Sequence, residues 1–322
     1  SKLYIEKSKR RIYVVRKMTG IKNRIKTNPG RMAFVVINTI LMVFFSMLFL
    51  FPYLNVVAKA FNEASDTALG GLTIYPRKFT LDYLEPVLKD SSIITGFKIT
   101  ILRVIIGSLW ALAVPYLAAF SLAQKKLCGR GFVVLLLTLP MFINGGLVSR
   151  FITYAKLGIY NTFWVYILPS GFSFFNMVVI RTFLQGISET YAEAARLDGA
   201  SEFRIVWSVY VPLSMPIIAT ILLWLGVERW NDYTTTLYFV QNPSLYTLPY
   251  VLQVSLKETE TVQKMIQDAI QNGLVVGGDV SSNTADSVNA AQLVVSTIPL
   301  LLLYPFLQKY FTKGISLGGI KE

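Results

Sequence analysis

The chain has 322 residues, of which 53% are hydrophobic and only 15% are charged. A soluble domain carries about a quarter charged residues, so this composition argues against a soluble protein and, with the long apolar runs, indicates an integral membrane protein. One cysteine, Cys128, and no histidine exclude an internal disulfide, histidine-based metal sites and catalytic triads.

The basic residues are concentrated at the N-terminus. Residues 1–31 hold eleven lysines and arginines against one acid, Glu6, and directly precede the first apolar run. Positive charge beside a span keeps a segment in the cytoplasm and contacts anionic lipid headgroups. The net charge of +13 also invites a nucleic-acid interpretation, but its distribution favours membrane anchoring. We therefore expect residues 1–31 to be a cytoplasmic segment and nucleic acid not to be a partner.

Six apolar runs are long enough to cross a bilayer as helices, which takes about 20 residues for about 30 Å of hydrocarbon. Prolines at positions 115, 140, 169 and 305 predict kinks or breaks. The predicted fold is all-α and multi-pass, with a transmembrane domain over residues 32–311. The six runs are about Met32–Val57, Phe97–Ala123, Phe132–Val148, Thr162–Phe183, Ser214–Phe239 and Ala291–Phe311.

Loop charges predict the orientation of these spans. The short loop after the second run carries Lys125, Lys126 and Arg130, whereas residues 241–290 contain only two lysines in fifty residues. Lysine and arginine accumulate on the cytoplasmic side. We therefore expect both termini, including the tail 312–322, to be cytoplasmic and residues 241–290 to be an extracellular loop, in which Glu260–Ile270 has the pattern of a weakly amphipathic helix.

The loop between the fourth and fifth runs, residues 188–214, predicts a helix-turn-helix. Ser188 is a suitable helix cap, and Gly199 stands where a first helix would end in the left-handed conformation. A second short helix, Glu202–Tyr210, leads to Pro212. Such an element could fit a cleft on a partner protein and carry its movement into the membrane, or it could only pack beside the membrane. These residues alone leave both interpretations open.

A family resemblance favours docking. Glu193-Ala194-Ala195, three residues, Gly199, nine residues and then Val209-x-Val211-Pro212 resemble the EAA signature of ABC importer permeases, although the two valines replace the usual isoleucine and leucine. The fuller string Glu-Ala-Ala-Arg-Leu-Asp-Gly-Ala-Ser resembles the carbohydrate-uptake, maltose-type branch. Residues 144–151 and 304–314 resemble subunits that import fragments of complex, often acidic polysaccharides.

The resemblance implies a permease subunit in the cell membrane that imports oligosaccharides, including acidic polysaccharide fragments. It implies four kinds of partner: a second permease subunit, two ATP-binding subunits, an extracytoplasmic solute-binding protein and membrane lipid. The tail Gly314–Glu322 is similar to tails that reach the ATPase interface, with disorder as the alternative. The residues implied in ATPase docking are Glu193, Ala194, Ala195, Asp198, Gly199 and Pro212.

ATP hydrolysis is not expected in this chain, because it lacks the Gly-x-x-x-x-Gly-Lys-[Ser/Thr] phosphate loop. The chain is therefore expected to be neither an enzyme nor the holder of a cofactor, and ATP and magnesium would belong to the partner ATPase.

A polar cluster interrupts the fifth run. Twelve residues separate Pro216 from Glu228, which is roughly 18 Å at about 1.5 Å per residue and reaches past the middle of the bilayer. Ionisable groups at that depth face a cavity or a partner. Two interpretations remain open: a translocation path in which Asn231 and Asp232 meet a sugar beside aromatic rings, or structural pairing, for example with Arg103. The candidate path residues are Arg103, Glu228, Arg229, Trp230, Asn231, Asp232 and Tyr233.

Two rival functions belong to other classes. Glu228 and Asp232, four residues apart, would share a helical face as the carboxylates of an intramembrane hydrolase must, but no nucleophile motif accompanies them. A channel or secondary transporter would need no ATPase, and uptake that persists without ATP would favour it.

Overall fold

The computed structural model describes residues 29–124, 127–143, 145–271, 286–299 and 301–302, and every regular element in these ranges is helical. The chain divides into two compact units, Ser1–Leu54 and Asn55–Glu322. The first predicted run forms α2, Pro29–Ala60, a helix of 32 residues. Its side chains from Met32 to Phe51 are exposed and, apart from Asn38, Thr39 and Ser46, apolar, which is typical of a membrane span.

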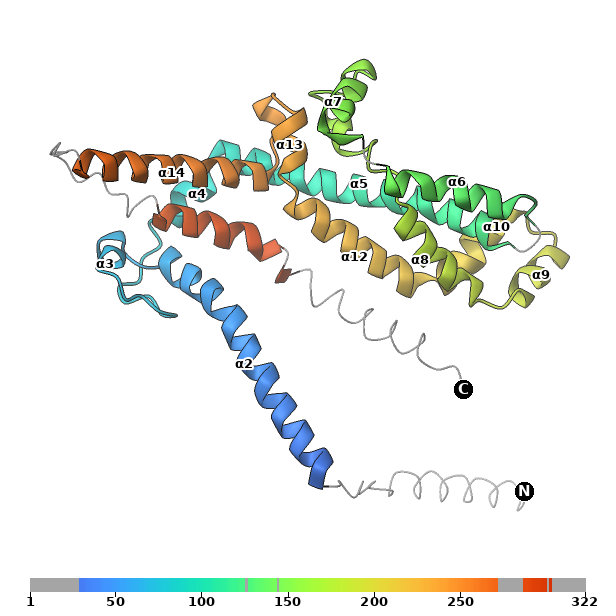
Figure 1. The fold of residues 1–322 in the computed structure, drawn as a ribbon, viewed down its shortest axis with the longest axis horizontal. Helices are drawn as coiled ribbons and strands as arrows, with labels where there is room; N and C mark the ends of the chain where they lie inside the picture. The colour runs from blue at the N-terminus through green and yellow to red at the C-terminus, as the bar shows by residue number, and fades with distance from the viewer. Residues whose placement is uncertain (1–28, 125–126, 144, 272–285, 300, 303–322) are drawn as a thin grey trace, which may run out of the picture. The chain divides into compact units, whose positions relative to one another are not determined.

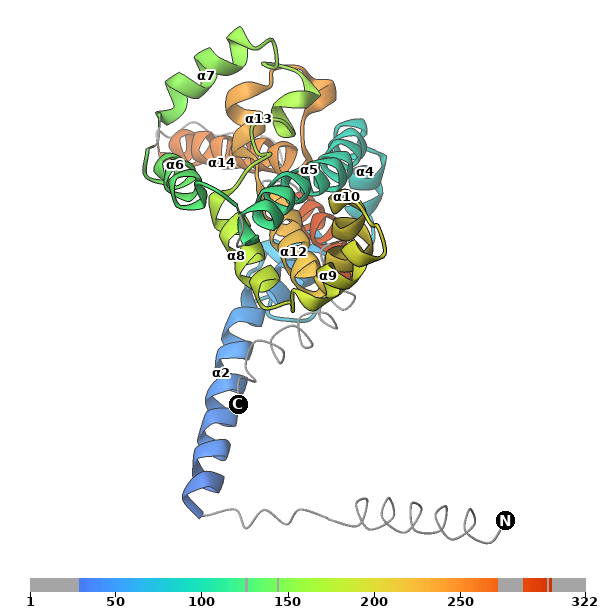
Figure 2. The same cartoon turned by 90° about the vertical axis from the view of Figure 1, so that its right-hand side faces the viewer.

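In the second unit, α5 is the central helix (Figures 1 and 2). It runs over Ser91–Ala123 and corresponds to the second predicted run. The helices that pack against it most extensively are α8 (Phe174–Gln185), α12 (Met215–Asn231) and α14 (Leu248–Gln271). α14 lies in the expected extracellular loop and is much longer than the predicted helix Glu260–Ile270.

Short helical elements join these long ones. The element η2 is a π-helical turn that comes just before Pro212, which has no N–H to donate to the helix. The short elements are α3 (Ala64–Ala68), α4 (Leu84–Lys89), α6 (Arg130–Phe142), α7 (Gly146–Lys156), η1 (Phe163–Tyr166), α9 (Thr190–Leu197), α10 (Glu202–Ile205), η2 (Val206–Tyr210), α11 (Val211–Leu213), α13 (Thr234–Phe239) and η3 (Pro243–Leu245).

The third predicted run is not one straight helix. It forms α6 and α7, which are bent by 112° relative to each other, with residue 144 between them outside the described residues. Gly146 at the start of α7 has φ +73°, a left-handed value that glycine adopts without steric cost. The predicted kink or break of this run is present just after Pro140, and one span over residues 132–148 stays a prediction.

The fourth predicted run is also interrupted. Its first half forms the turn η1 and an irregular segment containing Pro169, and only its second half is helical, in α8. Trp110 of α5 packs against Gly171 so closely that a Cβ there would lie 2.3 Å from the indole Nε1. The residues before α8 are apolar because Val165, Tyr166 and Ile167 belong to a buried cluster. The interruption predicted at Pro169 is present, and a span over 162–183 stays a prediction.

The number of spans stays a prediction. Within the described residues, two helices are long and apolar enough to cross a membrane, α2 and α5, and up to four if α6 with α7 and residues 202–213 with α12 each form one bent span. The sixth predicted run, Ala291–Phe311, is helical from residue 286 to 299 and at 301–302, and its end lies outside the described residues.

Gly96 allows a close contact between α5 and the start of α14. A Cβ at Gly96 would lie 3.1 Å from the backbone N and Cα of Leu248. The N–H of Leu248 donates a hydrogen bond of 2.9 Å to Oγ1 of the buried Thr100. We expect Gly96→Ala to lower the free energy of unfolding by about 1–3 kcal/mol, because the backbone of Leu248 has to move.

Thermal unfolding of the detergent-solubilised chain measures this effect, with Gly226→Ala of α12 as the matched control. A Cβ at Gly226 would meet only Cγ1 of Val104, at 3.9 Å, and alanine is the better helix former. Equal unfolding midpoints for the two variants would show that the contact at Gly96 is not tight.

Candidate functional site

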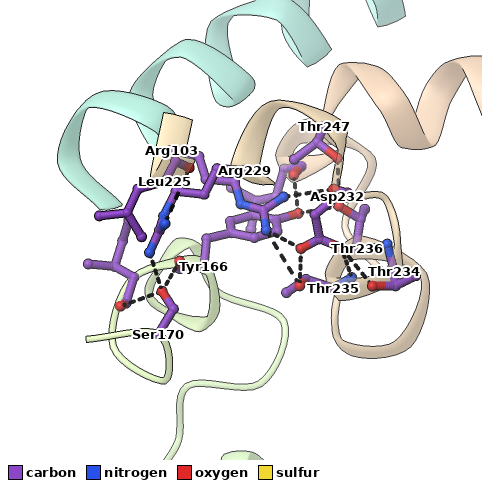
Figure 3. Close-up of polar contacts among 12 residues, drawn as sticks. Arg103, Tyr166, Ser170, Leu225, Arg229, Asp232, Thr234, Thr235, Thr236 and Thr247 are labelled. Carbon is purple, nitrogen blue, oxygen red and sulfur yellow. Dashed lines mark hydrogen bonds and ion pairs between the residues drawn. The ribbon is translucent and has the colours of Figure 1, made fainter. Parts of the chain in front are cut away.

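A cavity of ≈ 380 Å³ lies where the break between α12 and α13 faces α5, α7 and η1. Its polar lining combines three arginines, two acids, two tyrosines and two hydroxyl side chains. Figure 3 shows the central part of this cluster. The polar lining residues are Arg103, Arg150, Tyr154, Tyr166, Ser170, Glu228, Arg229, Asp232 and Thr235.

Asp232 separates α12 from α13. Its Oδ1 accepts hydrogen bonds from the backbone N–H of Thr234 at 2.9 Å and of Thr235 at 3.2 Å. Its Oδ2 accepts a bond of 2.5 Å from the Thr235 hydroxyl. A carboxylate is favourable at the N-terminal end of a helix. The fifth predicted run is therefore two helices, although Glu228 and Asp232, which were predicted to share a helical face, both line the cavity.

Arg103 of α5 is the ion-pair partner of Asp232 (Figure 3). Its guanidinium also donates a hydrogen bond of 2.8 Å to the backbone oxygen of Asp232 and lies 4.8 Å from the ring centre of Tyr166. The Tyr166 hydroxyl in turn donates to the oxygen of Leu245 at 2.8 Å and bonds Thr236 at 3.0 Å. Arg103 thus holds α5, η1 and α13 together, so this pair forms the interhelical contact that was the structural alternative for the polar cluster.

Arg229 occupies a different position. It is 4% exposed, and its terminal nitrogens donate to the Ser170 hydroxyl at 2.9 Å and to the oxygen of Leu225 at 3.4 Å (Figure 3). The described part of the chain gives it no carboxylate within ion-pair distance. Its neighbour Glu228 is exposed and lines the same cavity.

Three predicted path residues do not line the cavity. Trp230 is buried and meets the ring of Phe97 edge-on, with 5.9 Å between the ring centres. Asn231 is exposed and donates to the oxygen of Val227 in its own helix at 2.8 Å, and Tyr233 is half-buried outside the lining. Neither Trp230 nor Tyr233 therefore contributes a ring to the lining of this cavity.

Sequence reasoning missed the aromatic residues that do line the cavity, Tyr154 of α7 and Tyr166 of η1. Tyr154 is held by an edge-on contact with Phe239, with ring centres 4.8 Å apart. Tyr154 lies between the third and fourth predicted runs and Tyr166 lies just before the break in the fourth, and no motif marks either of them. Only the sequence Pro169-Ser170-Gly171 inside an apolar run signalled an irregular segment at this place.

The predicted helix-turn-helix is present in residues 188–214. α9 begins at Thr190, whose N–H donates to the Ser188 hydroxyl at 3.4 Å. Gly199 has φ +79°, and the N–H of Ala200 donates to the oxygen of Ala195 at 3.0 Å. This is the left-handed helix end that the sequence predicts. Ser201 then caps α10 by accepting from the N–H of Arg204.

An ion pair across the turn fixes the two helices of this loop. Arg196 donates to the two carboxylate oxygens of Glu202 at 2.7 and 3.1 Å. This hydrogen bonding, assisted by the charge of Arg196, lowers the pKa of Glu202, and the bond to Glu202 raises the pKa of Arg196. Both side chains are largely exposed, so the pair contributes mainly orientation. The sequence analysis did not identify it.

The loop presents apolar side chains to its surroundings. Leu197 is 90% exposed, and Phe203 and Trp207 are exposed with ring centres 6.0 Å apart. None of the three was predicted as a contact residue. Of the predicted docking residues, Ala195 is half-buried and five are exposed: Glu193, Ala194, Asp198, Gly199 and Pro212.

The loop is joined firmly to the helices beneath it. The hydroxyl of the buried Ser214 lies 2.7 Å from that of Tyr116 on α5 and donates to the oxygen of Tyr210 at 2.6 Å. Residues 202–213 meet α12 at an angle of 81°. A displacement of the loop would therefore be passed directly to α5 and α12.

Comparisons with known proteins identify the family of the chain. The model of the family "Binding-protein-dependent transport system inner membrane component" matches residues 116–317. Among curated relatives, protein LplC of Bacillus subtilis (strain 168) is 29% identical over 94% of this chain and 100% of its own length. The polygalacturonan/rhamnogalacturonan transport system permease protein YtcP of the same strain is 28% identical over 87% of this chain and 95% of its own.

A solved structure is similar over most of the chain. It is a crystal structure of a bacterial ABC transporter involved in the import of the acidic polysaccharide alginate, 26% identical, with a TM-score of 0.75 over 88% of this chain and 98% of the matched one. The family match covers the helix-turn-helix and every lining residue of the cavity except Arg103. The chain belongs to the binding-protein-dependent transport system inner membrane component family, whose members are permease subunits of ABC transporters.

Proposed function

We propose that the chain is one permease subunit of an importer that moves oligosaccharides, including acidic polysaccharide fragments, across the cytoplasmic membrane. The observation that carries this proposal is the helix-turn-helix of α9 and α10, with its exposed apolar side chains, on a chain of this family. The names of YtcP and of the alginate transporter support a polymeric sugar as cargo.

In this proposal the helix-turn-helix lies on the cytoplasmic side and docks into a separate ATPase. Two ATPase subunits, a second permease subunit and an extracytoplasmic solute-binding protein complete the assembly, and six spans leave both termini of this chain in the cytoplasm. When ATP draws the two ATPases together, the loop moves, and its bonds to α5 and its junction with α12 carry the motion into the membrane.

The cavity between α5, α7 and α12 then belongs to the translocation path. Its wall contains Arg103 and Asp232, whose ion pair joins two helices that the moving loop contacts. Relative movement of α5 and α12 would therefore reshape the cavity as the assembly alternates between outward- and inward-facing states.

Uptake by the reconstituted assembly tests the proposed function. Liposomes that hold this chain, its partner subunits and internal ATP are given labelled neutral and acidic oligosaccharides together with the binding protein. We expect accumulation of at least one sugar only when ATP and binding protein are both present. Uptake that persists without ATP would identify a channel or secondary transporter, and no uptake of any sugar would refute sugar import.

Docking predicts a specific role for Leu197. Covering a leucine side chain contributes about 1.5–3 kcal/mol, so we expect Leu197→Ala to weaken binding of the ATPase roughly 10- to 100-fold without changing the stability of the chain. Titration of the purified ATPase against the solubilised permease measures this affinity. Leu157→Ala is the matched control, since Leu157 is 66% exposed at the end of α7. Equal affinities for the two variants would contradict docking through Leu197.

A further inference from the structure

Arg229 is a buried cation that makes no ion pair with any of the described residues. Its side chain is 4% exposed, and its Nε is buried without a hydrogen-bond acceptor. The two bonds that it makes, to Ser170 and Leu225, use neutral oxygens and leave further N–H groups of the guanidinium available. A buried charge without an opposite charge is costly, because desolvation is not offset by an ion pair. An anion in the cavity would remove that cost.

Arg229 is the buried cation of the cavity that makes no ion pair with a described residue. The ion pair of Arg103 with Asp232 accounts for one charge of each sign, and Glu228 is exposed. A carboxylate, with one charge, matches a single guanidinium, whereas a phosphate carries close to two charges.

The position of Arg229 depends on Gly107 of α5. A Cβ at Gly107 would lie 2.8 Å from Nε and 3.2 Å from Cδ of Arg229. The absence of a side chain at position 107 therefore lets the guanidinium lie across α5 with its outer nitrogens directed toward Ser170 (Figure 3). The planar donor set is held in one orientation, as bidentate recognition of a carboxylate requires.

We propose that Arg229 binds the carboxylate of a sugar acid in this cavity and so selects uronate-containing oligosaccharides over neutral ones. The inference rests on the proposed import function. It names the residue that distinguishes charged from neutral sugars during that import. A volume of ≈ 380 Å³ lies in the usual range of small-ligand sites, about 300–1,000 Å³. Glu228, next in the chain, is placed to accept hydroxyl hydrogens of the same ligand, and Tyr154 and Tyr166 offer ring surfaces to it.

The test measures selectivity in the reconstituted assembly. The probes are trigalacturonate and a mannuronate trimer, each beside its carboxyl-reduced neutral counterpart, and the readout is the ratio of acidic to neutral uptake. Charged hydrogen bonds are worth about 1.5–3 kcal/mol, so we expect Arg229→Gln to lower this ratio roughly 10- to 100-fold. Arg229→Lys, which keeps the charge but not the planar fork, should recover part of it.

Two further variants separate recognition from folding. Gly107→Ala keeps Arg229 but displaces its guanidinium, so it should lower the same ratio, whereas Gly226→Ala, with open space around its Cβ, should not. Arg229→Gln removes a buried, unpaired charge, so its thermal unfolding midpoint should stay equal to that of the wild type or rise. In the wild type, 10 mM galacturonate should raise the midpoint more than equal concentrations of galactose or acetate do.

The outcomes distinguish this inference from the function on which it rests. If the wild-type assembly imports acidic sugars and Arg229→Gln leaves the ratio unchanged, the inference is wrong and import stands. If Arg229→Gln instead abolishes association with the second permease subunit and lowers uptake of all sugars equally, Arg229 pairs with a carboxylate of that subunit and the inference is also wrong. If the wild type imports neither kind of sugar, the proposed function itself fails.

Discussion

Replacing Arg103 with methionine is expected to lower the free energy of unfolding by about 3–5 kcal/mol, the usual effect of breaking a buried ion pair. Arg103 is 4% exposed and its ion-pair partner Asp232 is largely buried. The variant removes the cation but leaves the carboxylate in place, so Asp232 has to stay charged without its partner or become protonated. The same change removes the hydrogen bond to the backbone of Asp232 and the contact with the Tyr166 ring.

The unfolding midpoint of the solubilised chain measures this loss, and a double-mutant cycle apportions it. Lys98→Met is the matched control, because Lys98 is an exposed cation on the same helix, and it should change the midpoint little. Asp232→Asn in the Arg103→Met background should restore more than half of the loss, since asparagine can still accept from the first amides of α13. A double variant no more stable than Arg103→Met alone would show that the unpaired charge is not the cause.

The same ion pair explains why the fifth predicted run was misjudged. The run is apolar enough for one long helix, and the break at Asp232 rests on a partner in α5, 129 residues earlier in the chain. No local pattern carries that information. The chain turns at Asp232, and Glu228, Asp232 and Thr235 nevertheless line the same cavity.

Features that depend only on local sequence were predicted well. α2 and α5 follow from uninterrupted apolar length, and the turn at Gly199 follows from the need for a left-handed residue after α9. The cavity could not be predicted in this way, because the positions of α7 and η1 around it depend on packing between residues distant in sequence, of the kind seen between Trp110 and Gly171. Sequence identified the arginines and acids on α5 and α12, but not the tyrosines that face them.

A second large effect on transport is expected from substitution of Gly199, at the turn between α9 and α10. Replacing Gly199 with valine should reduce ATP-driven uptake at least tenfold, because a β-branched residue at φ +79° is strongly disfavoured. To relieve that strain the backbone must leave the left-handed region, which changes the angle between α9 and α10. The pair between Arg196 and Glu202 would then lose its bidentate geometry, and Leu197 and Phe203 would no longer present one surface to the ATPase.

Gly199→Asn is the matched control, since asparagine tolerates the left-handed region better than other residues with a side chain. A Cβ at position 199 meets no atom within 4 Å, so crowding inside the chain cannot distinguish the two variants. Uptake and ATPase binding measured side by side should fall for valine and stay near wild type for asparagine. If uptake and ATPase binding fall equally for both variants, any side chain at position 199 blocks the partner's surface. Close contact with the partner, rather than backbone conformation, would then be the reason for glycine at this position. If uptake and ATPase binding fall for neither variant, the helix-turn-helix does not couple ATP hydrolysis to transport. It would then be only a packing element beside the membrane.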